Sequence, residues 1–263
     1  MDIFIYLFAG AIAGILSGLF GVGGGLIIVP ILSLVFTGLA FPQEHIMHMA
    51  LGTSLATIIV TAISSARAHH HNANVDWSVV GRIAAGIVCG TLLGSILAAN
   101  LQTAWLKAIF AVFVFVVATQ LILNISPNPK RGLPGLLGMG LAGTIIGTIS
   151  SLVGIGGGSL SVPFLIYCNI PVKKAIGTSA ATGLPIALSG TLGFVLIGWN
   201  TPQLPAYSLG YVFLPAMMGI ALASALTAQL GAKLAQRLPA ITLKRAFAIL
   251  LYLVGFKMLW DML

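Results

Sequence analysis

The sequence predicts an all-α polytopic membrane protein built from two inverted-topology repeats, each a glycine-broken helical hairpin followed by three transmembrane helices. Apolar residues make up 59% of the 263 residues, and charged residues only 6%. Soluble domains carry about 25% charged residues, so this chain cannot cover its surface in water. Its long apolar stretches show no strict alternation, which favours helices over the strands of a barrel. A glycine-rich segment recurs about half a chain later and indicates the repeat.

The first repeat begins with a unit over residues 3–38 that contains the pattern G-x-G-G-G-x4-P at residues 21–30. Glycine runs are poor in a helix interior, and a membrane tolerates broken backbone only where protein or a water-filled cavity covers it. We therefore expect two helical arms joined at the glycines. Three uninterrupted spans are expected to follow, at residues 48–66, 79–99 and 104–124.

The second repeat has the same order of elements. Its glycine-broken unit covers residues 135–168 and carries G-x-G-G-G-x4-P at residues 154–163. An A-x-G-T-S segment also occurs in both halves, at residues 50–54 and 175–179. The three spans expected here are residues 174–197, 207–231 and 243–261. These correspondences divide the chain into a first repeat at residues 1–125, a linker at 126–134 and a second repeat at 135–263.

The basic residues decide whether each glycine-broken unit crosses the membrane or returns to the side it entered. A single crossing would divide the 12 Lys and Arg residues almost evenly, whereas a returning hairpin places all but Lys107 and Lys257 on one side. The positive-inside rule favours the hairpin, with both chain termini on the non-cytoplasmic side. A hairpin plus three spans makes an odd number of net crossings, so the second repeat is expected to be inverted relative to the first.

The two glycine tips are candidate anion-binding sites. A helix N-terminus presents unpaired N–H groups and about half a positive charge, and glycine lets an oxyanion approach that backbone closely. The expected substrate-binding residues are Gly23, Gly24, Gly25, Gly156, Gly157 and Gly158, with hydroxyl donors from Thr53, Ser54, Thr178 and Ser179. The alternatives are that the glycines only allow close helix packing and that the hydroxyls bond their own helix backbone. Packing is the favoured interpretation for the isolated glycines Gly86, Gly90 and Gly94.

Few ionisable residues lie within the apolar spans, where a charge is a functional candidate. Arg67 and Arg82 are candidates for the path of an anion, with snorkelling to the interface as the alternative. His48 is a candidate for proton coupling because histidine titrates near neutral pH, and a place in an interface loop is its alternative. Residues 69–74, which include three histidines, predict a solvated loop.

The sequence shows no nucleophile triad, acidic pair or cluster of metal ligands. We therefore expect neither an enzyme nor a protein with a cofactor or bound metal. The formal charge of +8 comes from basic residues in short loops between apolar spans, which indicates topology control and excludes nucleic acid as a partner. The expected partners are a small anion, the lipid bilayer and a coupling proton.

Taken together, both G-x-G-G-G-x4-P segments, both A-x-G-T-S segments and the two-repeat layout resemble the sulfite exporter TauE/SafE family over nearly the whole chain. The resemblance implies a secondary transporter that moves sulfite, sulfoacetate or another organosulfonate across the bacterial inner membrane, in the direction of export. Inverted repeats suit alternating access, because the two halves can exchange conformations. The alternatives are an anion channel and an uptake permease for another sulfur oxyanion on the same scaffold.

Overall fold

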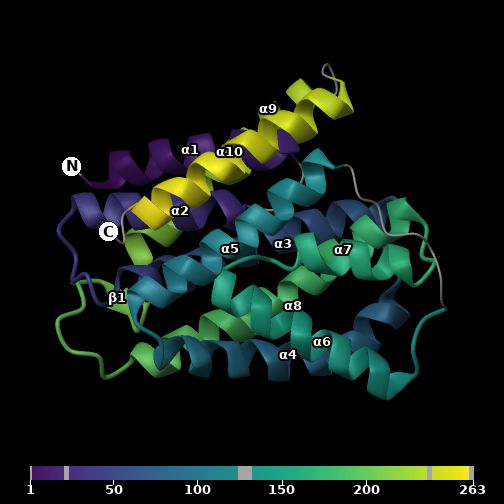
Figure 1. The fold of residues 1–263 in the computed structure, drawn as a ribbon, viewed down its shortest axis with the longest axis horizontal. Coiled ribbons are helices and arrows are strands. Elements are labelled where there is room, and N and C mark those ends of the chain that lie inside the picture. The colour runs from purple at the N-terminus through teal and green to yellow at the C-terminus, as the bar shows by residue number, and fades with distance from the viewer. Residues whose placement is uncertain (1, 21–23, 124–131, 236–238, 261–263) are drawn as a thin grey trace.

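The computed structural model describes residues 2–20, 24–123, 132–235 and 239–260, and within these ranges it contains ten helices and one two-stranded sheet. Figure 1 shows the helices running back and forth along the long axis of the molecule. The elements are α1 (Asp2–Phe20), α2 (Gly25–Gly38), α3 (Ile46–His71), α4 (Trp77–Ala99), α5 (Thr103–Ile122), α6 (Leu136–Val153), α7 (Gly158–Tyr167), α8 (Val172–Gly198), β1 (Ser208–Leu209), β2 (Val212–Phe213), α9 (Leu214–Ala235) and α10 (Ala240–Trp260).

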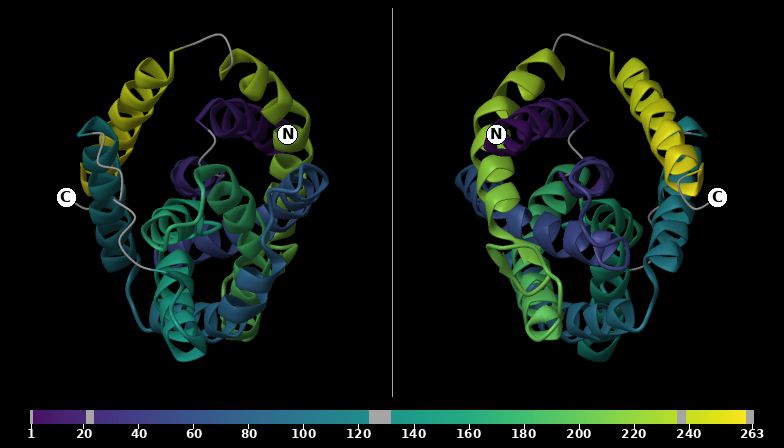
Figure 2. Two further views of the ribbon diagram at one scale, coloured as in Figure 1. Left: turned by 90° about the vertical axis from the view of Figure 1, so that its right-hand side faces the viewer. Right: turned by 90° about the vertical axis from the view of Figure 1, so that its left-hand side faces the viewer.

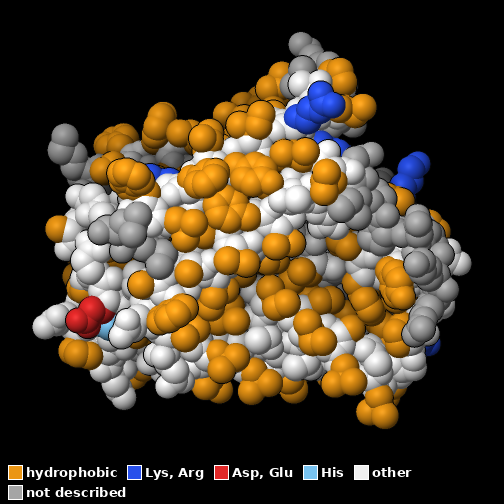
Figure 3. Space-filling view, viewed as in Figure 1, with side chains coloured by type: hydrophobic (Ala, Val, Ile, Leu, Met, Phe, Trp, Pro, Cys, Tyr) orange, Lys and Arg blue, Asp and Glu red, His pale blue; other side chains and the backbone are white. Residues whose placement is uncertain are grey.

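The helices have the length and surface of a membrane protein. Among the described residues, six helices are long and apolar enough to cross a bilayer: α3, α4, α5, α6, α8 and α9 over Leu214–Gly231. Large apolar side chains are exposed along the outer helices, for example Val112 on α5, Leu141 on α6 and Leu226 on α9. Figure 3 shows hydrophobic side chains spread over one whole face. These features confirm the prediction of an all-α polytopic membrane protein.

Two expected boundaries were wrong. Residues 69–71 are the last turn of α3 and not a loop, and the ring nitrogen Nδ1 of His70 accepts a hydrogen bond of 3.1 Å from Trp77 Nε1. The span expected to begin at residue 207 begins at Leu214, because residues 208–213 form the small antiparallel sheet. Its turn contains Gly210, whose φ of +56° is unfavourable for L side chains.

The helices pair across the two halves of the chain in a matching pattern. The first arm of each hairpin packs along a spanning helix of the other half: α1 along α9, and α6 along α4. The remaining pairs join spanning helices, α3 with α8 and α5 with α10. Figure 2 shows α5 and α10 together on one side of the molecule and α9 with α1 on the other. Among the described helices, all except α2 and α7 therefore have their main partner in the other half.

Close contacts give the direction of two of these pairs. On α3 and α8, Gly52 lies against Phe194, whereas Ala62 lies against Gly183, so these two helices are antiparallel. On α5 and α10, Phe115 meets Tyr252 and Phe256, and Thr119 shares a hydrogen bond with Tyr252. Figure 1 shows that α5 and α10 also run in opposite directions. By position in the repeats, each of these pairs joins corresponding helices.

Glycines make the α4–α6 contact close. A Cβ atom added at Gly90 would lie 2.6 Å from Thr144 Cα, and one at Gly94 would lie 3.0 Å from Thr148 Cα. The shortened distance also lets Thr148 Oγ1 donate a hydrogen bond of 3.0 Å to the Gly90 carbonyl. Small residues at membrane helix contacts allow this approach of two backbones. The packing interpretation is thus confirmed for Gly90 and Gly94, and Gly86 packs in the same way on the backbone of α6.

A pair of alanine substitutions on α4 tests this packing. Gly90→Ala places its Cβ against the backbone of α6, so we expect the free energy of unfolding to fall by about 1–3 kcal/mol. Gly81→Ala is the matched control, because a Cβ at Gly81 meets no atom within 4 Å and alanine favours the helix by about 1 kcal/mol. Thermal unfolding of the detergent-solubilised variants measures both effects. Equal melting temperatures for the two variants would contradict the packing argument.

Candidate functional site

The two glycine tips of the chain meet inside the molecule. A Cβ atom added at Gly25, at the start of α2, would lie 2.7 Å from Ile155 Cα in the second tip. Ser54 Oγ of α3 donates a hydrogen bond of 2.9 Å to the carbonyl of Gly154. Gly23, which was expected at the site, lies outside the described residues. The structure therefore brings together Gly25, Ser54 and the second tip.

The second tip needs glycine for its backbone conformation. Gly154 ends α6 with a φ of +71°, and Gly157 precedes α7 with a φ of +79°. L side chains rarely adopt such angles. The carbonyl of Gly157 accepts hydrogen bonds from the N–H groups of Leu160 and Ser161, at 3.0 and 2.7 Å, which begins the first turn of α7. The first N–H groups of α7 consequently have no acceptor within their own helix.

Two buried serine hydroxyls flank this helix start. Ser150 on α6 is 0% exposed and Ser161 on α7 is 1% exposed, and neither hydroxyl has a hydrogen-bond partner among the described residues. A Cβ atom at Gly157 would lie 3.3 Å from Ser161 Oγ and 3.8 Å from Ser150 Oγ. A buried hydroxyl without a partner is unfavourable, and such groups need an explanation. Here they lie beside a helix N-terminus, where partial positive charge gathers.

The sequence interpretation missed Ser150 and Ser161. Both stand close to the glycines, Ser150 four residues before Gly154 and Ser161 three residues after Gly158. Their position in the second tip was the available signal. Ser179, which was expected at the site, is 2% exposed and its hydroxyl also has no partner within the described part of the chain.

An isoleucine fills the space beside the second tip. Ile186 on α8 is fully buried, and its Cδ1 is the atom nearest to the place of a Cβ on Gly157. Ser161 Oγ and Ser150 Oγ are the next nearest atoms. The terminal methyl of Ile186 and the two hydroxyls thus all lie beside Gly157. Ile186 directly follows Pro185, which supplies no N–H to the helix ladder of α8.

The first tip differs from the second in polarity. Ile28 on α2 stands three residues after Gly25, the place that Ser161 has in the second tip. A Cβ at Gly24 would lie 2.7 Å from Ile28 Cδ1, so an apolar side chain covers this glycine. Ser17 of α1 remains at the first tip, with its Oγ 4.0 Å from the place of a Cβ on Gly24, so the two tips differ by the isoleucine that stands in place of Ser161.

The matching threonines hold the two halves together. Thr53 Oγ1 accepts a hydrogen bond of 3.0 Å from the N–H of Phe213, just before α9. Thr178 Oγ1 accepts one of 2.9 Å from the N–H of Asp76, just before α4. Each threonine thus binds the other half of the chain at the corresponding place. This role accounts for both threonines without a ligand, and their contact with an anion stays a prediction.

The charged candidates lie elsewhere. Arg67 and Arg82 are exposed on α3 and α4. Ile58 of α3 lies beside the second tip at Gly156, and Arg67 follows it by nine residues, about 13 Å along the helix. Their place on an anion path stays a prediction.

His48 is buried in the first turn of α3, not in a loop. Its Nε2 lies 2.9 Å from the Ala98 carbonyl oxygen, and its ring stacks on Tyr211 with centroids 5.0 Å apart. The hydrogen bond to a carbonyl places the proton on Nε2 in the neutral ring. Nδ1 has no partner among the described residues. A role in proton coupling stays a prediction.

The family of the chain follows from its similarity to known proteins. Residues 6–258 match the family model described as Sulfite exporter TauE/SafE. The chain belongs to the TauE/SafE family. It is a multi-pass membrane transporter of that family.

Relatives of the TauE/SafE chain are similar to it along nearly their whole length. A probable membrane transporter protein of Haemophilus influenzae is 41% identical over 258 residues, which cover 97% of each chain. One of Methanocaldococcus jannaschii is 28% identical, over 97% of this chain and 94% of the relative. The protein YunE of Bacillus subtilis, with the same description, is 26% identical over 99% of this chain and 98% of the relative. No solved structure matches the chain.

Replacing Thr53 by valine tests the contact between the halves. The substitution keeps the shape but leaves the buried N–H of Phe213 without its acceptor, which costs about 1–3 kcal/mol of folding free energy. Thr61→Val on the same helix is the control, because Thr61 Oγ1 bonds only its own helix, at the Ile58 carbonyl among the described residues. We expect a lower melting temperature for Thr53→Val alone. A melting temperature equal to that of the control would show that this hydrogen bond does not stabilise the contact between the halves.

Proposed function

We propose that this TauE/SafE protein is a secondary transporter for a small sulfur-containing anion, such as sulfite, sulfoacetate or another organosulfonate. The observation that carries the proposal is the pair of unpartnered hydroxyls, Ser150 and Ser161, beside the start of α7. Together with the N–H groups of the first turn, they form a buried set of donors. The relatives named as probable membrane transporter proteins support the part of this proposal that concerns membrane transport, not the choice of anion.

The chemistry of the donors favours a weakly basic oxyanion. A sulfonate offers three acceptor oxygens and has little affinity for a proton, so neutral O–H and N–H donors suit it. Glycine at position 157 keeps the backbone bare, so an oxygen can approach the N–H groups closely. The donor set described here contains no cation, and the helix dipole supplies the positive potential instead.

Alternating access is proposed from the packing of the two halves. The corresponding helices α3 and α8 pack antiparallel, as the two copies of an inverted repeat would. In Figure 1 the hairpin of α1 and α2 opens toward the end of the molecule that holds both chain termini, and that of α6 and α7 opens toward the other end. Two tips that enter from opposite faces and meet can each be exposed to one side in turn.

Sidedness is proposed from the basic residues. At the end away from the termini, the described part of the chain carries Arg67, Arg82, Lys173, Lys174, Lys233, Lys244 and Arg245. At the end that holds the termini it carries Lys107 and Lys257. The positive-inside rule therefore supports termini on the non-cytoplasmic side of the bacterial inner membrane. We propose export, with the anion entering from the basic end.

The position of Ile186 favours a carrier over a channel. Its terminal methyl lies beside Gly157, and the two hydroxyls next to it are buried, so the site is closed in this structure. A bound anion requires this side chain to move, and Pro185 weakens the α8 backbone at that point. A carrier requires a site that closes around its ligand, whereas a channel requires an open path.

Serine-to-alanine substitutions test the anion site. We expect Ser161→Ala and Ser150→Ala to lower the uptake of labelled sulfite and sulfoacetate into proteoliposomes by about ten-fold or more, because donors to the anion are lost. Stability should not fall, since neither hydroxyl has a partner among the described residues.

The control for these two variants is Ser189→Ala. Ser189 is also buried, but its hydroxyl bonds the Pro185 carbonyl of its own helix. Transport by this variant should match that of the unchanged protein. Normal flux in both site variants, or no flux of any sulfur anion in the folded wild type, would reject the proposed function.

Shortening Ile186 tests the closure of the site. Ile186→Val removes the methyl beside Gly157, so we expect tighter binding and a lower KM for the transported anion. Loss of one buried methylene costs about 1 kcal/mol of stability, and Ile146→Val on α6 controls for that loss. Transport assays at several anion concentrations measure KM for both variants. An unchanged KM in Ile186→Val would show that the side chain does not occupy the site.

A further inference from the structure

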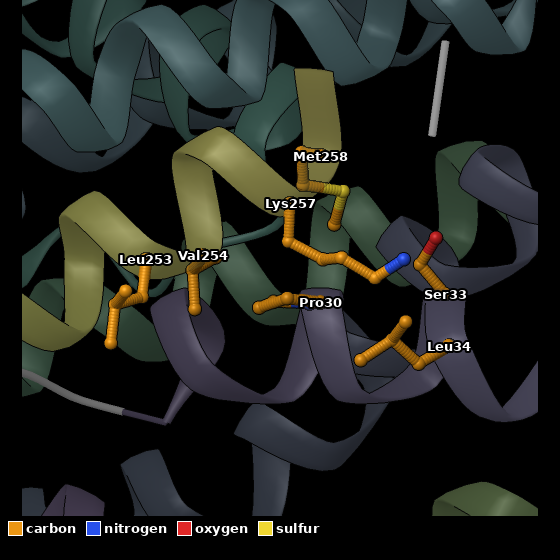
Figure 4. Close-up of a pocket in the computed structure, with 7 residues that line it drawn as sticks. All are labelled: Pro30, Ser33, Leu34, Leu253, Val254, Lys257 and Met258. Carbon is orange, nitrogen blue, oxygen red and sulfur yellow. The ribbon is translucent and has the colours of Figure 1, made fainter. Parts of the chain in front are cut away.

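A cleft lies between α2 and α10, apart from the glycine tips. Its volume is about 180 Å³, and Figure 4 shows side chains of both helices facing across it. Pro30 is the proline of the first G-x-G-G-G-x4-P segment and stands opposite Val254. It lies five residues beyond Gly25, about 7.5 Å along α2. The cleft therefore lies on the side of the tip toward the chain termini.

Most of the cleft wall is apolar. Pro30 and Leu34 line it from α2, and Leu253, Val254 and Met258 line it from α10. Met258 is 3% exposed, so the wall continues into the packed interior of the molecule. A wall of this kind favours a short hydrocarbon group over a hydrated ion.

Two polar groups stand at one end of the cleft. Lys257 belongs to the last turn of α10, and Ser33 of α2 is 4% exposed. A lysine near the end of a spanning helix ordinarily extends toward water. Lys257 is exposed, and in Figure 4 its side chain points along the cleft toward Ser33. The cleft thus has an ammonium group at one end and an otherwise apolar wall.

The cation is particular to this half of the chain. When Phe247 is matched with Phe110, as the similar sequences around them suggest, Lys257 corresponds to Gln120 of α5. Ser33 likewise corresponds to Ile166 of α7 when the two glycine segments are matched. The repeat architecture by itself therefore does not place this pair here.

We propose that the α2–α10 cleft binds an amphiphilic anion, with one acidic head at Lys257 and Ser33 and a short apolar chain against Pro30, Val254 and Met258. Two sources share this chemistry: a free organic anion and the head region of an anionic lipid. The cleft is a second site, because the glycine tip offers neutral donors and the cleft offers an ammonium group. The proposal does not depend on which anion is transported.

Binding of hexanesulfonate to the purified protein in a non-ionic detergent tests this site by calorimetry. We expect Lys257→Met to weaken binding by about ten-fold or more, because a charge-assisted contact is lost. Lys244→Met, which removes the same charge from an exposed position near the start of α10, should leave the affinity unchanged. Val254→Trp fills the cleft without altering its charge and should also weaken binding. Hexanol, which has no charge, should bind no more tightly to the wild type than to Lys257→Met.

The remaining measurements separate the possible sources and the two sites. Phosphatidylglycerol that stabilises the wild type but not Lys257→Met, with no effect of hexanesulfonate, would identify a lipid as the occupant. Binding retained in Ser161→Ala supports a site separate from the glycine tip, whatever the transport assays show. Binding lost in Ser161→Ala but kept in both Lys257→Met and Val254→Trp would overturn the proposal, as would equal affinity in all variants.

Discussion

The contact between the glycine tips is the constraint on which the rest of the arrangement depends. Gly25 approaches the backbone of Ile155 so closely that no side chain fits between them. Ser54 fixes the same tip from α3 through the carbonyl of Gly154. A broken helix inside a bilayer must find partners for its backbone within the protein. Gly25 of the first tip and Ser54 of α3 supply part of that shelter for the second tip.

This contact makes the two halves interdependent. The first arm of each hairpin packs along a helix of the other half, α1 on α9 and α6 on α4. Thr53 and Thr178 add one hydrogen bond in each direction between the halves. A rigid separation of the halves would break all of these contacts at once. A change of access is easier to reconcile with movement of helix pairs, such as α6 with α4, than with movement of whole repeats.

The repeats share their packing but not their chemistry. The corresponding threonines, Thr53 and Thr178, make the same kind of contact between the halves, whereas Gly24 has a φ of −64° and its counterpart Gly157 a φ of +79°. The polar groups differ, because Ser161 faces Gly157 where Ile28 covers Gly24. Lys257 and Ser33 are likewise without counterparts of the same type. Duplication thus accounts for the scaffold, and the differences between the copies make single sites of defined polarity.

The sequence alone determined the membrane class, the hairpins and most spans. Composition and long apolar runs depend on the solvent around the chain, and glycine and proline act locally on the backbone, so both can be seen in the sequence. Local pattern did not show that Thr53 binds the backbone before α9, because the two residues are 160 positions apart. Nor did it show that Ile186 lies beside Gly157, next to the two serines. Those contacts arise only when segments far apart in the chain pack together, so the tertiary structure decided which hydroxyls brace the fold and which have no partner among the described residues.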